Sequence, residues 1–421
     1  MQRDNGSQGS SRRDVLKTSA ALGAAAVLTG LGGNFAHAAG SDTFKVGLIG
    51  CGGRGSGAAR DCMEGSKRSG ANVTIAAVGD VFEGQARGQQ KAWKLPDDKC
   101  FWGLDAYKKV IDSGVDMVIL ATPPGFRPYH FQYAIEKGKH VFFEKPVAVD
   151  PTGIRIVMET ADIAKQKGLG VVAGTQRRHE SNYIETIKRI HDGAIGDIMH
   201  MSVYWNGGGI WARNREPWMS DVEYQIHNWY HYIWTCGDHI VEQHVHNLDV
   251  ANWVMGGHPI SAYGMGGRQV RRDPGQIWDH FAIEYEYANG GRVLSFCRHW
   301  PETDGNVSEF AIGTKGMSNP GGWIQPTGGR RQGFRNNGSG YVLEHADLQK
   351  SIMDGKPLNE GRQVAESTMN AIMGRMSAYT GKRVSWDFAM NSKLNTMPAN
   401  LDLKGKLPEP PVPMPGTEKL I

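Results

Sequence analysis

Cysteine is scarce in this sequence, and no two cysteines are spaced as a Cys-x-x-Cys pair. There are five in 421 residues, an odd number. A disulfide framework or a zinc ribbon needs regularly spaced pairs, so neither is expected. The chain also lacks an excess of one charge, because its formal net charge is only +4. We therefore expect no nucleic-acid partner.

Long hydrophobic runs are absent too, and one weakly apolar stretch lies near the N-terminus. It extends from residue 18 to residue 31, after Arg12 and Arg13 and before Ala36-His37-Ala38. A stretch this short and this rich in Ala and Gly does not span a bilayer stably. The order of these features predicts a twin-arginine signal over residues 1–40. We therefore expect an exported protein, periplasmic or extracellular, without stable membrane insertion.

A glycine-rich turn follows the first strand predicted after that signal. The strand covers residues 44–49, and Gly50-Cys51-Gly52-Gly53-Arg54-Gly55 leads from it into a helix-compatible segment. This is the G-x-G-x-x-G pattern in the context that dinucleotide binding requires. Gly50 permits the tight turn, Gly52 lets the backbone approach a pyrophosphate, and Gly55 allows close helix-to-strand packing.

An acidic residue ends the next predicted strand. That strand covers residues 72–78, and Gly79-Asp80 follows it. A carboxylate at this distance from the glycine turn binds the ribose hydroxyls of NAD and repels the phosphate of NADP. Arg87 lies close enough in the sequence to leave NADP open. We predict NAD as the cofactor, with NADP as the alternative.

Two further buried strands end in distinctive turns. Residues 115–120 precede Ala121-Thr122-Pro123-Pro124, and residues 141–143 precede Glu144-Lys145-Pro146. Ligands bind at the carboxyl ends of strands in an open α/β sheet, which makes Lys145 a positioned cation. A solvated strand end is the other interpretation of this lysine. The alternation of strands and helices predicts an α/β fold with a Rossmann-type domain over residues 41–175.

The second half has a dense group of titratable residues at positions 237–249. On one continuous helix, Glu242, His246 and Asp249 would share a face. Carboxylates one turn from a histidine fix its tautomer and raise its basicity, as a general base requires. Two other interpretations stay open, a buried structural network around His246 and a metal site. We expect no metal, because a catalytic zinc does not need a dinucleotide site.

Aromatic side chains are concentrated at positions 204–234. Their faces stack on the C–H faces of sugars, although any single one suits a core equally well. As a group they favour a carbohydrate-sized cleft, with Tyr204 and Trp229 as substrate contacts. Further on, the pattern predicts strands over residues 263–299 with a hairpin turn at 288–291, a loop over 319–340, a helix over 364–380 and a Pro-rich tail over 387–421.

Together these motifs resemble those of the Gfo/Idh/MocA oxidoreductases, named for glucose-fructose oxidoreductase, inositol dehydrogenase and a rhizopine catabolism protein. The resemblance rests on the glycine turn, Asp80, the turn with Thr122 and Pro123, His130 and, above all, the Glu144-Lys145-Pro146 tripeptide. It implies that these residues bind the cofactor. It also implies a C-terminal α+β domain over residues 176–386 with an open, mainly antiparallel sheet, and a homo-oligomer, either a dimer or a tetramer.

The resemblance implies catalytic roles as well. His246 would be the proton acceptor, Lys145 would bind and polarise the reacting oxygen, and Glu242 would orient or contact the substrate. The family has Asp where this chain has Glu242, which moves the carboxylate outward. Asp249 and a basic residue after a strand, either Arg177 or its neighbour, would touch the substrate.

The sequence therefore predicts an exported NAD(P)-dependent oxidoreductase that acts on a hydroxyl group of a sugar or polyol. Export removes the enzyme from a free nicotinamide pool, so we expect a tightly bound cofactor that is reoxidised within each cycle. An NAD-dependent glycosidase, which oxidises its substrate transiently so that a bond is eliminated and then hydrated, is the first alternative. A non-enzymatic carbohydrate-binding protein is the second.

Overall fold

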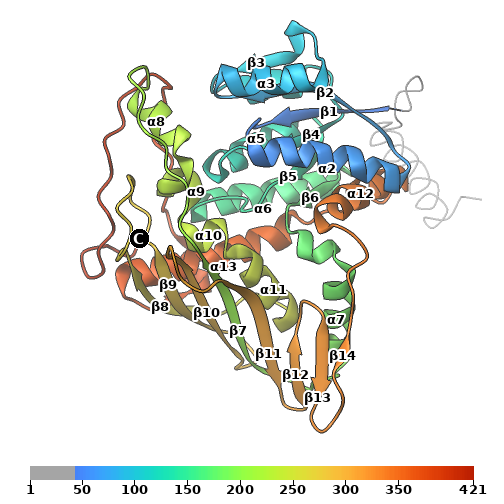
Figure 1. Cartoon of the computed structure of the whole chain (residues 1–421), viewed down its shortest axis with the longest axis vertical. Helices are drawn as coiled ribbons and strands as arrows, with labels where there is room; N and C mark the ends of the chain where they lie inside the picture. Colours follow the sequence, from blue (N-terminus) through green and yellow to red (C-terminus); the bar gives the residue numbers. More distant parts are fainter. Residues whose placement is uncertain (1–42) are drawn as a thin grey trace, which may run out of the picture. The chain divides into compact units, whose positions relative to one another are not determined.

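A parallel sheet of six strands organises the N-terminal half of the computed structural model, which describes residues 43–421 (Figure 1). The strands are β1 (Thr43–Ile49), β2 (Asn72–Asp80), β3 (Cys100–Trp102), β4 (Met117–Leu120), β5 (His140–Phe143) and β6 (Val171–Ala173). Their order is β3-β2-β1-β4-β5-β6. The order reverses between β1 and β4, where ligands bind in such sheets. The predicted Rossmann-type fold is confirmed.

Five helices connect these strands. They are α2 (Gly53–Ser69), α3 (Glu83–Trp93), α4 (Ala106–Asp112), α5 (Arg127–Glu136) and α6 (Pro151–Gln166), with short 3₁₀ turns η1 (Asp97–Lys99) and η2 (Pro124–Phe126). Asp150 caps α6, because its side chain accepts a hydrogen bond from the N–H of Gly153 at 2.8 Å. The predicted signal over residues 1–40 lies outside the described residues.

The turn from β1 into α2 needs glycine at two positions for different reasons. Gly50 has a φ of +95°, which is in the left-handed region that glycine adopts readily. At Gly55 the limit is space, because an added Cβ would lie 1.8 Å from the carbonyl oxygen of Gly50. The first turn of α2 can therefore pack against β1 only without a side chain there.

A second sheet of nine strands forms the C-terminal half. It contains β7 (Ile198–Gly207), β8 (Ser261–Gly267), β9 (His280–Glu286), β10 (Arg292–His299), β11 (Asn306–Gly313), β12 (Gly316–Asn319), β13 (Trp323–Pro326), β14 (Gln332–Gly333) and β15 (Val384–Ser385). Only the β7–β10 pair is parallel among its registered pairs, which confirms the mainly antiparallel sheet. The loop predicted over residues 319–340 is wrong in part, because β13 and β14 extend this sheet.

The helices of the second half partly return to the first sheet. They are α7 (Ser181–His191), α8 (Asp221–His227), α9 (Ile233–Cys236), α10 (His239–Glu242), α11 (Val245–Met255), α12 (Gly340–Met353), α13 (Gly361–Thr380) and α14 (Trp386–Asn391), with η3 (Gln176–His179) and η4 (Trp229–His231). Helix α12 packs along α2, and α13 packs against α6 (Figure 1). Residues 44–421 form one compact unit, so the domain boundary near residue 175 stays a prediction.

After α14 the chain has no helix or strand up to residue 421. This segment, residues 392–421, is called the C-terminal strap below. It is bound to the rest of the protein, since Trp278 Nε1 donates to the carbonyl oxygen of Pro413 at 3.0 Å and Tyr232 donates to Glu409 at 2.9 Å. Within residues 43–421 no helix has the length and apolar character that crossing a membrane requires.

Gly55→Ala is expected to lower the free energy of unfolding by about 1–3 kcal/mol, because the added methyl group overpacks the turn. Gly57→Ala is the matched control in the same helix, since its Cβ would lie 3.4 Å from the Arg54 side chain. That change should raise stability by up to about 1 kcal/mol, as expected for Gly to Ala inside a helix. Urea unfolding of both variants measures this, and equal effects would contradict it.

Candidate active site

A cavity of about 570 Å³ lies at the carboxyl ends of the parallel strands. Its walls come from the turns after β1, β2, β4 and β5 and, in the second half, from β7, α8, η4, α10 and α11. Every residue that the sequence predicted to bind the cofactor lines this cavity, namely Gly50, Gly52, Gly53, Arg54, Gly55, Asp80, Thr122, Pro123, His130, Glu144 and Lys145.

The glycine turn forms an open cradle in this wall. A Cβ atom added at Gly52 or Gly53 would meet no atom within 4 Å. No side chain caps the N-terminus of α2, although the first N–H groups of a helix need an outside partner. An anion supplies that partner. The turn therefore fits the pyrophosphate of a dinucleotide.

Asp80 fits the adenosine ribose of the same ligand. Its Oδ2 accepts from the N–H of Cys51 at 2.7 Å, and its Oδ1 accepts from the N–H of Phe82 at 2.9 Å. Each carboxylate oxygen keeps a second acceptor position, so two ribose hydroxyls can still donate to it. Burial raises the pKa of Asp80, and the backbone N–H groups that bind it oppose that shift.

Lys145 leaves the end of β5 and reaches Glu242, the last residue of α10. Its Nζ donates to the backbone carbonyl oxygen of Glu242 at 2.6 Å and lies 3.2 Å from Oε1. The two side chains are only 10% and 7% exposed, so water screens the pair weakly. Oε2 of Glu242 is buried without a hydrogen-bond partner. A hydroxyl group of a bound ligand would satisfy that oxygen.

The single helix predicted across residues 237–249 is wrong. Helix α10 ends at Glu242, and α11 begins at Val245. In a continuous helix the N–H of His246 would donate to the carbonyl oxygen of Glu242. That oxygen accepts from Lys145 instead, and the N–H of His246 donates to Gln243 at 3.2 Å. The lysine thus occupies the acceptor that the helix would have used.

His246 lines the cavity beside this break. Its ring stacks on Trp205 of β7 with the centroids 5.6 Å apart, and its Nδ1 is buried without a partner. Burial lowers the pKa of His246 well below its ordinary value, and the positive charges of Lys145 and Arg177 lower it further. The raised basicity that the sequence predicted for His246 is therefore wrong, and the imidazole is neutral at pH 7.

Asp249 lies in a buried ion pair and does not line the cavity. Its carboxylate accepts two hydrogen bonds from the Arg178 guanidinium, at 2.8 and 2.9 Å, and one from the Ser367 hydroxyl at 2.7 Å. The resemblance implied a substrate contact for Asp249, which lies three positions after His246. The carboxylate is instead fully used in joining η3, α11 and α13.

Of the other three predicted substrate contacts, only one lies in the cavity wall. Trp229 lines the cavity, whereas Arg177 and Tyr204 do not. Arg177 forms a buried ion pair with Glu309 of β11. Tyr204 stacks on Phe296 of the neighbouring strand, with the centroids 5.6 Å apart. Successive side chains of a strand point to opposite faces, so the residue after Tyr204, and not Tyr204, reaches the cavity.

Arg127 is a cavity residue that sequence reasoning missed. Its guanidinium donates to the carbonyl oxygens of Thr122 and Pro146, so it joins the turns after β4 and β5. Burial lowers the pKa of Arg127 to about 10. An arginine at the start of a helix is ordinarily solvated, and nothing in the local sequence marks this one as buried.

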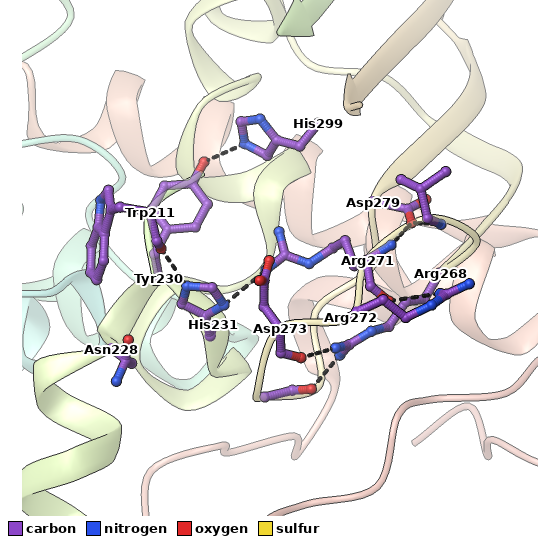
Figure 2. A network of polar contacts seen from close by, with 12 residues as sticks. Trp211, Asn228, Tyr230, His231, Arg268, Arg271, Arg272, Asp273, Asp279 and His299 are labelled. Carbon is purple, nitrogen blue, oxygen red and sulfur yellow. Dashed lines mark hydrogen bonds and ion pairs between the residues drawn. The ribbon is translucent and has the colours of Figure 1, made fainter. Parts of the chain in front are cut away.

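A polar network holds Trp211 at the cavity wall (Figure 2). His231 Nε2 donates to the carbonyl oxygen of Trp211 at 2.7 Å, while His231 Nδ1 accepts from Arg271 at 2.8 Å. Tyr230 also lines the cavity, and its hydroxyl lies 2.9 Å from His299 Nε2. Trp211 itself is 41% exposed. Buried groups thus fix the backbone of an exposed aromatic residue.

Among residues 43–421 no group of three or more His, Cys, Asp or Glu side chains is placed to hold a metal ion.

Two models of one protein family match most of the described chain. Residues 44–174 match the oxidoreductase family with an NAD-binding Rossmann fold, and residues 183–318 match the GFO/IDH/MocA C-terminal domain. The chain belongs to the Gfo/Idh/MocA oxidoreductase family. Residues 9–29 match a twin-arginine translocation signal, which marks this family member for export by that route.

Relatives within the family are distant. The scyllo-inositol 2-dehydrogenase (NAD(+)) of Bacillus subtilis is 27% identical over 192 residues, which are 46% of this chain and 49% of that protein. The chain thus matches about half of that relative's length. Two solved structures share the fold over 82% of this chain and 99% of theirs, each at 17% identity. They are levoglucosan dehydrogenase in complex with NADH and levoglucosan, with a TM-score of 0.65, and aldose-aldose oxidoreductase from Caulobacter crescentus, with a TM-score of 0.62.

Asp249→Ala is expected to lower the free energy of unfolding by about 3 kcal/mol, because it leaves the Arg178 guanidinium buried without its counter-charge. The double variant Arg178→Met/Asp249→Leu should recover most of that loss, since it removes both charges. Urea unfolding measures each variant. Unchanged stability of Asp249→Ala together with a raised KM would instead support the substrate contact that the sequence predicted.

Proposed function

We propose that this chain is an NAD-dependent oxidoreductase that oxidises a hydroxyl group of a sugar or polyol. The observation that carries the proposal is that Lys145, Glu242 and His246 line the same cavity as the glycine turn. The aromatic walls at Trp205 and Trp229 suit the C–H face of a sugar ring. A cation, a neutral base and a dinucleotide cradle in one cavity are what oxidation of an alcohol requires.

In this proposal His246 removes the proton of the substrate hydroxyl as a general base. Lys145 donates to the carbonyl oxygen and to Oε1 of Glu242, and its third N–H donor can bind the oxygen that becomes negative. Oε2 of Glu242 accepts from a neighbouring hydroxyl and so orients the ring. When bound, NAD supplies the nicotinamide that accepts the hydride. Inositol and levoglucosan, named for the relatives above, both carry several ring hydroxyls.

NAD is preferred to NADP in this proposal because Arg87, the first arginine after Asp80 in the sequence, binds other residues. Arg87 pairs with Asp97 at 2.9 Å and lies over the ring of Trp102 at 4.8 Å. It does not line the cavity, whereas Asp80 does. A 2′-phosphate would therefore meet the Asp80 carboxylate without Arg87 beside it.

Because the chain carries a twin-arginine signal, we expect the cofactor to stay bound between turnovers. No free nicotinamide pool is expected outside the cytoplasm, so a released NADH would not be replaced. A second substrate must then reoxidise the cofactor in place. The name of the Caulobacter crescentus structure, an aldose-aldose oxidoreductase, is in keeping with transfer between two sugars.

A glycosidase that oxidises its substrate transiently is the second candidate. Trp211 and Arg213 also line the cavity, and their side chains could contact a leaving group attached to the oxidised ring. Aryl glycosides offered without added NAD test this. Release of the aryl group favours the glycosidase, whereas an oxidised sugar formed with a second carbonyl acceptor favours the oxidoreductase. Saturable binding with neither product would favour a carbohydrate-binding protein.

Lys145→Ala is expected to retain bound NAD and to lose turnover by about 10²–10³-fold, because the charge that stabilises the developing alkoxide is gone. Lys137→Ala is the control, since Lys137 is exposed and pairs with Asp112 outside the cavity. Steady-state kinetics and titration with NAD measure both properties. Wild-type turnover of Lys145→Ala would reject its proposed role.

The acid limb of kcat/KM is expected below pH 6.5, the ordinary pKa of histidine. The base must be neutral, and a lowered pKa keeps His246 neutral as the pH falls through that value. A profile of kcat/KM from pH 4 to pH 8, limited to the range in which circular dichroism shows folded protein, measures it. A limb centred at or above 6.5 would exclude His246 as the base with the pKa that its burial implies.

A further inference from the structure

Helix α8 covers the part of the cavity where the adenosine half of a dinucleotide would lie. Ile226 and His227 of α8 line the same cavity as Asp80 and Phe82. The rings of His227 and Phe82 meet edge to face, with centroids 5.6 Å apart and an interplanar angle of 85°. We propose that α8 is the outer wall of the adenosine site and that the C-terminal strap holds it there, which retains the cofactor. The inference rests on the proposed function, because it needs a dinucleotide in this cavity.

Apolar contacts hold α8 against the turns of the first sheet. Val222 and Ile226 of α8 belong to one buried cluster with Tyr232 and Trp234. Side chains from three turns of the Rossmann half and from the strap pack on that cluster: Val81, Phe82, Leu104, Phe126, Met397, Leu401, Leu403 and Leu407. Helix α8, the turns at the adenosine end of the cavity and the strap therefore pack into one small hydrophobic core.

Polar contacts bind the strap directly to α8. Ser220, the N-cap of the helix, donates from its hydroxyl to the carbonyl oxygen of Leu403 at 2.6 Å. Gln225 donates to the carbonyl oxygen of Leu407 at 2.9 Å, and the N–H of Leu407 donates to Asp221 at 3.1 Å. These three hydrogen bonds and the Lys404–Glu223 ion pair thus join α8 and its N-cap to residues 403–407 of the strap.

The far end of α8 is fixed as well. Asn228 follows the helix, and its side chain accepts from the N–H of Arg213 at 2.8 Å and donates to the carbonyl oxygen of Arg213 at 3.1 Å. This is the segment that His231 holds through Trp211 (Figure 2). Both Arg213 and Trp211 line the cavity. The wall therefore continues from the adenosine end toward His246.

A helix of seven residues is too short to be stable by itself. The contacts at its two ends and along its apolar face must therefore hold α8 over the cavity. Release of a dinucleotide past this wall requires α8 to move, and the strap opposes that movement. Weakening the strap should therefore speed release without altering the residues that would bind the cofactor.

The test compares Leu403→Ala/Leu407→Ala with Val412→Ala in the full chain. Val412 lies in the same strap and is partly buried, but it packs on the main core and not on the α8 cluster. Each protein is loaded with NADH, and its release into excess NAD is followed by fluorescence. We expect release about tenfold faster in the double variant, equivalent to about 1.4 kcal/mol, and unchanged in Val412→Ala. Leu403→Ala alone should release NADH about threefold faster than the wild type, and it replaces the double variant in the test if the double variant does not fold.

Different results would contradict the role of the strap and the proposed function. A folded double variant that releases NADH at the wild-type rate overturns the role of the strap and leaves the proposed function intact. Equal acceleration in Val412→Ala also overturns it, because general loosening of the protein would then explain the effect. A wild-type chain that binds no NADH overturns the proposed function, and the inference with it.

Discussion

One hydrogen bond determines the geometry of the site, that from Nζ of Lys145 to the carbonyl oxygen of Glu242. A nearly buried ammonium group needs partners that replace water, and this carbonyl and the carboxylate beside it supply them. The bond occupies the acceptor that would continue α10 into α11, and the helix is interrupted at Gln243 and His244. The same charge contributes to the lowered pKa of that histidine. Lys145 thus affects the position of the proposed base, and it adds to burial in lowering the pKa of that base.

The first half could be predicted from sequence because its determinants are local. A glycine turn, an acidic residue after the next strand and a Glu-Lys-Pro tripeptide each lie directly after a buried strand. Parallel strands bring their carboxyl ends to one edge of a sheet, so residues at those ends converge without any long-range information. That is why every predicted cofactor residue lines the cavity, from Gly50 to Lys145.

The second half could not be predicted to the same depth, because its decisive partners are distant in sequence. Asp249 pairs with Arg178 across 71 residues, and Glu242 meets Lys145 across 97. Helical spacing predicts which residues would share a face, but not whether a distant cation takes one of the helix acceptors. Alternation along β7 likewise separates Tyr204 from Trp205 without saying which of them the helices leave facing the cavity.

The order of the chain also connects the site to the export signal. Tyr341 of α12 lines the cavity with the Arg54 guanidinium 5.0 Å from its ring centroid, and the strap holds α8 from beyond residue 400. The cofactor site that begins at Gly50 is therefore complete only when the last segments of the chain are in place. A chain exported unfolded would have to acquire its dinucleotide where no pool supplies it. The twin-arginine route carries folded proteins, so in our proposal the site is filled before export and the strap then retains the cofactor.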